Sequence, residues 1–122
     1  MKAAQIIFWS AAIWGFVVLI PGLFGEAALG VAMPPAITHP EFYYGFYGVA
    51  LVFQLIFVMI ARDPERYGAL IPIAILEKCA FFAPTLWLYH QGRVSVGGPF
   101  YGAMIDGVWM LLFAFAWWKN RA

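Results

Sequence analysis

Residues 49 to 61 read VALVFQLIFVMIA, an apolar run that only Gln54 interrupts. The run lies inside a longer segment, from about Glu41 to Ala61, that carries no charge after its first residue. A helix needs about 20 predominantly apolar residues to cross the hydrocarbon core of a bilayer. The segment therefore predicts a membrane-spanning helix with one polar side chain in its interior.

Three further segments meet the same criterion of length and apolarity. They run from about 3 to 24, from about 67 to 90 and from about 99 to 118. The first is longer than the apolar region of a signal peptide, about 7–15 residues, so a retained helix is favoured over a cleaved leader. Because the linkers are short, consecutive helices are expected to run antiparallel. We predict an all-α fold, a transmembrane antiparallel four-helix bundle that forms one integral membrane domain over residues 1–122.

The composition agrees with a membrane protein and excludes several functions. The chain is 65% hydrophobic and only 11% charged, whereas a soluble domain carries about a quarter charged residues. A formal net charge of +1 gives no basic surface for nucleic acid, so the lipid bilayer is the first expected partner. The sequence has no Ser–His–Asp arrangement, no nucleotide-binding glycine loop, no HExxH motif and no metal-ligand spacing. We therefore expect no enzymatic activity, no metal and no cofactor.

The positions of the basic residues predict the orientation in the membrane. Four crossings place one group of cations on a common side: Lys2, Arg62, Arg66, Lys119 and Arg121. Only Arg93 falls on the other side, so the positive-inside rule predicts that both termini are cytoplasmic. Arg62 and Arg66 are also candidates for contact with lipid headgroups, although their place in a cytoplasmic turn already explains them and is the favoured interpretation.

The connections between the predicted helices contain turn and capping signals. Asp63 is expected to cap a helix whose first residue is Pro64, where the missing N–H has no cost. The Gly-, Ala- and Pro-rich stretch 25–40 is expected to be a loop at the outer membrane interface. Glycines in the second and fourth segments predict close approach between helices; they are Gly45, Gly48, Gly102 and Gly107.

Charged residues inside the predicted spans are the best candidates for function. Residues 75–82, ILEKCAFF, carry Glu77 and Lys78, and Asp106 lies at a similar depth in the last segment, with Gln54 somewhat shallower. An unpaired charge at the centre of a membrane helix costs about 2.5–3.5 kcal/mol, so these side chains are expected to face inward and find partners. Successive helical residues point about 100° apart, which argues against a Glu77–Lys78 pair. Lys78 is expected to pair with Asp106, leaving Glu77 near Gln54; the reverse pairing stays open.

Two functions are compatible with such a polar cluster. It can fix helix register in a non-enzymatic protein that binds a partner, forms a homodimer or stabilises a membrane complex, and this interpretation is favoured. Alternatively, the surplus carboxyl can hold a proton or a cationic group in a small transporter or lipophilic-ligand-binding protein. Pro72 and Pro84, on either side of Glu77, are expected to weaken the helix there. A ligand-sized cavity that reaches Glu77 or Asp106 would distinguish the second function from the first.

Several short motifs resemble those of an uncharacterised family of small bacterial four-helix integral membrane proteins. They are HPEFYYG at 39–45, ARDP at 61–64, RY at 66–67 and LEK at 76–78. In size and helix number the chain is also similar to DoxX-like small membrane proteins. The resemblance implies a multi-pass protein of the bacterial inner membrane, and it implies no activity, cofactor or catalytic residue.

Overall fold

The computed structural model describes residues 2–121, and every regular element in that range is a helix. The elements are α1 (Lys2–Gly22), α2 (Glu26–Ala32), α3 (Pro40–Arg62), the 3-10 helix η1 (Gly68–Leu70), α4 (Ile71–His90) and α5 (Gly98–Arg121). Within the described residues, α1, α3, η1 with α4, and α5 give four helical segments long and apolar enough to cross a membrane. The predicted all-α bundle is confirmed, and these segments indicate a multi-pass membrane protein.

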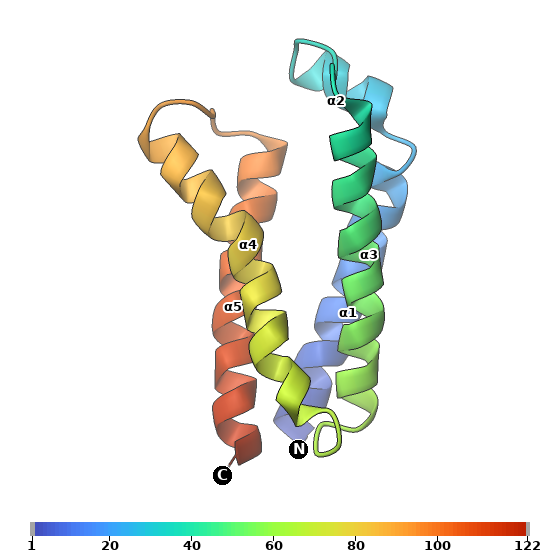
Figure 1. The fold of residues 1–122 in the computed structure, drawn as a ribbon, viewed down its shortest axis with the longest axis vertical. Helices are drawn as coiled ribbons and strands as arrows, with labels where there is room; N and C mark the ends of the chain where they lie inside the picture. The colour runs from blue at the N-terminus through green and yellow to red at the C-terminus, as the bar shows by residue number, and fades with distance from the viewer. Residues whose placement is uncertain (1, 122) are drawn as a thin grey trace.

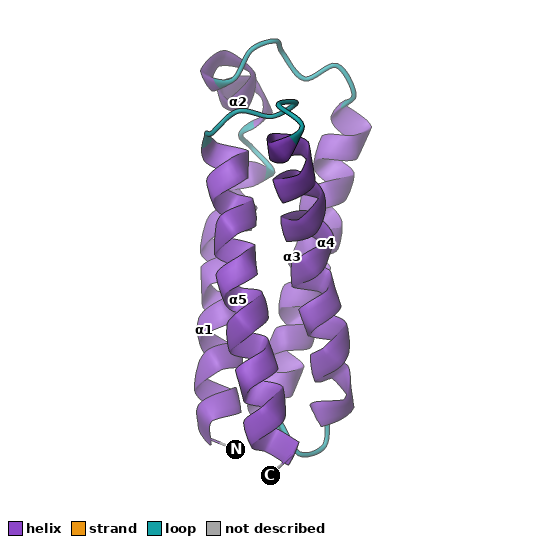
Figure 2. Cartoon of the chain, turned by 90° about the vertical axis from the view of Figure 1, so that its left-hand side faces the viewer, coloured by secondary structure: helices purple, strands orange, loops and turns teal. Residues whose placement is uncertain are grey.

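The long helices are arranged as two hairpins. α1 packs mainly against α3, and α4 packs mainly against α5 (Figure 1). Between the hairpins, α1 also contacts α5, whereas α3 and α4 make few contacts with each other. The two chain ends lie together with the α3–α4 turn at one end of the bundle, which we call the terminal end (Figures 1 and 2). The short helix α2 lies at the opposite end, which we call the α2 end.

The compact core of the bundle lies in its terminal half. Its centre is an aromatic core of Phe8, Phe57 and Phe113, each fully buried. The ring centroids of Phe8 and Phe113 are 4.2 Å apart, and those of Phe57 and Phe113 are 5.1 Å apart. Small side chains around these rings allow the helices to approach closely, as in other membrane bundles; they are Ala4, Ala11, Ala12, Ala61, Ala74 and Ala116.

Glycine has a packing role at only some of the predicted positions. A Cβ atom added at Gly107 would lie 2.6 Å from the ring of Phe82, so glycine lets α5 approach α4 there. No heavy atom lies within 4 Å of such a Cβ at Gly45 or Gly48. The prediction of close approach was therefore wrong for these two glycines, because α3 turns that face away from its neighbours.

The stretch 25–40 is not only a loop, because it contains helix α2. Its sequence, EAALGVA, is rich in residues that favour helices, and Glu26 lies in the first turn, where the helix dipole favours an acid. Side chains of α3 hold this region in place. The hydroxyl of Tyr44 donates a hydrogen bond to Glu26 Oε1 at 2.9 Å, and that of Tyr43 donates one to the carbonyl of Gly22.

The predicted cap at Asp63 and the predicted weakening at Pro72 are also corrected. Asp63 Oδ1 accepts a hydrogen bond from the Arg66 backbone N–H at 3.2 Å, but residues 64–67 form turns and no helix starts at Pro64. Asp63 is instead the C-cap residue of α3, immediately after its last residue, Arg62. Pro72 lies in the first turn of α4, where a missing N–H breaks no helical hydrogen bond. Pro84 is the proline inside α4.

Candidate functional site: a cavity with a polar floor

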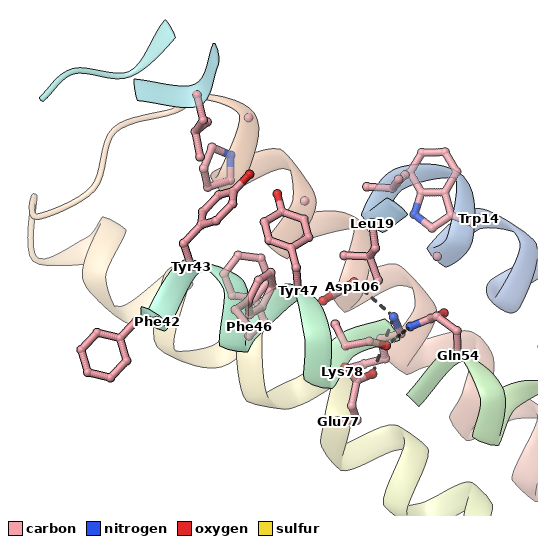
Figure 3. A pocket seen from close by; sticks show the side chains of 18 residues that line it. Trp14, Leu19, Phe42, Tyr43, Phe46, Tyr47, Gln54, Glu77, Lys78 and Asp106 are labelled. Carbon is pink, nitrogen blue, oxygen red and sulfur yellow. Dashed lines mark hydrogen bonds and ion pairs between the residues drawn. The ribbon is translucent and has the colours of Figure 1, made fainter. Parts of the chain in front are cut away.

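The structure brings the buried polar residues of three helices together. Lys78 Nζ on α4 lies 3.4 Å from Asp106 Oδ1 on α5 and 3.7 Å from Glu77 Oε1. Lys78 is only 5% exposed, and Gln54 on α3 is 1% exposed. Figure 3 shows these four side chains gathered in one place, and we call them the polar cluster. Two carboxylates and one ammonium leave the cluster with one surplus negative charge when both acids are ionised.

The internal pairing of the cluster differs from the sequence prediction in two respects. The Lys78–Asp106 pair is present as predicted. Glu77 also approaches Lys78, although the two residues are adjacent, because the long lysine side chain extends over the carboxylate of its neighbour. Gln54 makes no hydrogen bond to Glu77. Its Nε2 instead donates a hydrogen bond to the backbone carbonyl of Ala50 at 2.7 Å.

Two acceptor atoms in the polar cluster have no hydrogen-bond donor. Neither Gln54 Oε1 nor Glu77 Oε1, both buried, accepts a hydrogen bond from any group within residues 2–121. The 3.7 Å separation between Lys78 Nζ and Glu77 Oε1 is an electrostatic contact, and it is too long for a hydrogen bond. A buried acceptor without a donor costs about 1–3 kcal/mol. The described part of the chain therefore leaves two buried acceptors of the cluster unsatisfied.

A cavity of about 530 Å³ extends from the polar cluster toward the α2 end. Binding sites for small molecules usually have volumes of about 300–1,000 Å³, apolar walls and a few polar groups. Aromatic side chains line much of this cavity, and we call them the aromatic wall: Trp14, Phe42, Tyr43, Phe46, Tyr47 and Phe81. Figure 3 shows Phe42, Tyr43 and Phe46 on the side of the cavity away from the polar cluster. The space is thus amphipathic, with a polar floor and an aromatic wall.

The aromatic core closes the floor of the cavity. Lys78 Nζ lies 5.2 Å from the centroid of the Phe57 ring, close enough for a cation–π contact. Phe57 packs on Phe8 and Phe113, which fill the terminal half of the bundle. The cavity therefore occupies the α2 half, where the two hairpins diverge (Figure 1), and the packed core separates it from the terminal end.

The structure also shows which predicted residues do not belong to this site. Arg62 ends α3 and Arg66 lies in the following turn, both at the terminal end and both exposed. The Arg66 guanidinium lies 5.5 Å from the centroid of the Tyr67 ring. Neither arginine lines the cavity. Their contact with lipid headgroups stays a prediction that is separate from the polar cluster.

The aromatic wall was not predicted from the sequence, although a signal for part of it is present. On α3 the lining residues are Phe42, Tyr43, Phe46, Tyr47, Ala50 and Gln54. Their spacing of three to four residues marks one helical face that leads to the polar Gln54. The contributions of Trp14 and Phe81 have no such signal, because they depend on how the two hairpins are placed relative to each other.

Comparisons of the chain with known protein families, curated proteins and solved structures gave no match.

Proposed function

We propose that this chain is a membrane-embedded binding protein for a lipophilic small molecule, whose polar group would lie on the polar cluster and whose apolar body would lie against the aromatic wall. The observation that carries the proposal is a cavity of about 530 Å³ that is lined by Gln54, Glu77, Lys78 and Asp106. A cavity of this size can enclose most of a small ligand.

The rival function, stabilisation of a complex through a buried polar cluster, fits the geometry less well. Polar groups that only join helices are most effective when every donor and acceptor is paired in a closed bundle. Here Gln54 Oε1 and Glu77 Oε1 have no donor within residues 2–121, and the polar cluster to which they belong lines a cavity. A ligand that supplies donors would complete the cluster. A transporter would use the same site but would need a second arrangement in which the aromatic core opens.

The proposal includes the orientation in the membrane. We propose a bacterial inner-membrane protein with both termini in the cytoplasm, supported by the basic residues at the terminal end. The cavity would then lie in the half of the membrane away from the cytoplasm, and a ligand would enter from there. A cysteine introduced at Arg93 should react with a membrane-impermeant thiol reagent added to intact cells. Reaction only after lysis would indicate the opposite orientation.

Filling the cavity should abolish binding without unfolding the protein. Gly102 lines the cavity one helical turn before Asp106, and a Cβ added there would make only an ordinary contact, at 3.9 Å from Phe81. In Gly102→Phe the new ring should occupy the path to the polar cluster. We expect saturable binding of radiolabelled 1-dodecanol to the protein in nanodiscs to fall by about tenfold or more, equivalent to at least 1.4 kcal/mol.

The matched control is Gly45→Phe, because Gly45 lies in a helix, is exposed and has no heavy atom within 4 Å of an added Cβ. It should bind 1-dodecanol as the unsubstituted chain does, and empty nanodiscs give the partition background. A thermal unfolding curve for each variant verifies that it is folded. Equal binding by a folded Gly102→Phe and by Gly45→Phe would contradict the proposed function, as would the absence of saturable binding to the unsubstituted chain.

A further inference from the structure

The chemistry of the polar cluster also specifies the polar group of the ligand. We propose that the cavity selects amphiphiles with a protonated primary or secondary amine, whose N–H groups are donated to the carboxylates of Glu77 and Asp106. This inference rests on the proposed function and extends it from a lipophilic ligand to an alkylammonium ligand.

The two carboxylates at the floor of the cavity are accessible to a ligand. The side chains of Glu77 and Asp106 are 16% and 20% exposed and line the cavity, whereas that of Lys78 is only 6% exposed. Each carboxylate can accept several hydrogen bonds, and Asp106 accepts one from Lys78 at 3.4 Å. A ligand that brings N–H donors would supply hydrogen bonds that the described part of the chain does not provide.

The net charge of the polar cluster also favours a cationic headgroup. With both acids ionised, Glu77 and Asp106 carry two negative charges against the single positive charge of Lys78. A cationic headgroup would neutralise the surplus charge, whereas an anionic headgroup would increase it. The charge effect is strong because the site is buried in a low-dielectric environment. Lys78 is not free to receive an anionic headgroup, because its ammonium already faces two carboxylates.

The aromatic wall is also suited to an alkylammonium ligand. Indole, phenol and phenyl rings attract cations to their faces, and they also provide apolar area for an alkyl chain. Trp14, Tyr47 and Phe81 come from three different helices and line the same space as the polar cluster. An ammonium group that enters through this space would meet aromatic faces first and then the carboxylates of Glu77 and Asp106 at the floor. Figure 3 shows this arrangement of Tyr43 and Tyr47 relative to the polar cluster.

The inference is tested by competition between ligands that share one dodecyl chain and differ in the headgroup. Radiolabelled 1-dodecanol bound to the protein in nanodiscs is displaced by dodecylamine, dodecyltrimethylammonium or dodecanoate. The amine has both charge and N–H donors, the quaternary ammonium has charge alone, and the carboxylate has the opposite charge. We expect dodecylamine to bind about tenfold more tightly than dodecyltrimethylammonium, as one charge-assisted hydrogen bond predicts, and dodecanoate to bind most weakly.

Two variants assign the preference to Glu77. Glu77→Gln should lower the affinity for dodecylamine by about tenfold relative to the affinity for 1-dodecanol. The same substitution at the exposed Glu65, in the turn at the terminal end, should change neither value. Dodecanoate binding as tightly as dodecylamine, or dodecyltrimethylammonium equalling the amine, would overturn the inference while leaving the proposed function intact. Loss of saturable 1-dodecanol binding in the unsubstituted chain would instead refute the proposed function itself.

Discussion

Replacing Lys78 by methionine is expected to lower the free energy of unfolding by about 3 kcal/mol, the largest effect among the polar residues. Lys78 Nζ lies 3.4 Å from Asp106 and 3.7 Å from Glu77, and the residue is 5% exposed. Its removal leaves two partly buried carboxyls without a cation. We place the loss at the lower end of the range for broken buried pairs because a carboxyl that loses its cation can become neutral by protonation.

A second substitution should reverse part of that loss. Lys78→Met combined with Asp106→Asn removes one of the two carboxyls and should be more stable than Lys78→Met alone. Lys119→Met is the control, because Lys119 is an exposed lysine in the last turn of α5; it should cost less than about 1 kcal/mol. Unfolding of the four proteins in the same detergent, followed by circular dichroism, provides the comparison. If Lys78→Met is as stable as Lys119→Met, the lysine does not hold the cluster together.

Phe57→Ala is expected to destabilise the protein by about 3 kcal/mol, the low end of the range for buried Phe→Ala substitutions. The Phe57 ring is fully buried and packs against both Phe8 and Phe113, and the Lys78 ammonium lies 5.2 Å from its centroid. Lipid gives helices no hydrophobic advantage over one another, so the loss comes from packing and from the cation–π contact. The substitution should also open the floor of the cavity toward the terminal end.

The same substitution at an exposed position separates these effects from a general loss of aromatic area. Phe115 on α5 is 46% exposed, so Phe115→Ala should lower the free energy of unfolding by less than about 1 kcal/mol. Thermal unfolding of the two variants in one detergent measures the difference. Equal stability would mean that the aromatic core is not the main packing centre, and that some other contact closes the terminal half of the bundle.

The sequence predicts the membrane spans and the residues of the polar cluster because both depend on distances along a helix. Bilayer thickness sets the length of an apolar segment, so the spans follow from runs such as VALVFQLIFVMIA. Depth along each helix likewise places Lys78 and Asp106 at a common level, and the two residues are paired in the structure. Because an unpaired charge in lipid is costly, Lys78 is expected to pair with an acid at the same depth.

The remaining features depend on packing in three dimensions, which residue spacing does not describe. The contact between Glu77 and Lys78 depends on the path of a flexible lysine side chain, so the angle between adjacent helical positions was a poor guide. Helix α2 is short, and its sequence stands within a Gly-, Ala- and Pro-rich stretch that resembles a loop. The cavity arises because alanines let the hairpins close around Phe57 in the terminal half, whereas large aromatic side chains line the space in the α2 half.

Photoaffinity labelling tests the central claim most directly, because it reports where a ligand lies. A long-chain primary amine with a diazirine on its alkyl chain is irradiated with the protein in nanodiscs, and the labelled peptides are identified by mass spectrometry. We predict labels on the cavity-lining parts of α3 and α5, within 42–54 and 98–106, that unlabelled dodecylamine displaces. Labels that are not displaced and that fall on lipid-facing residues such as Val108 and Leu111 would contradict a ligand-binding cavity.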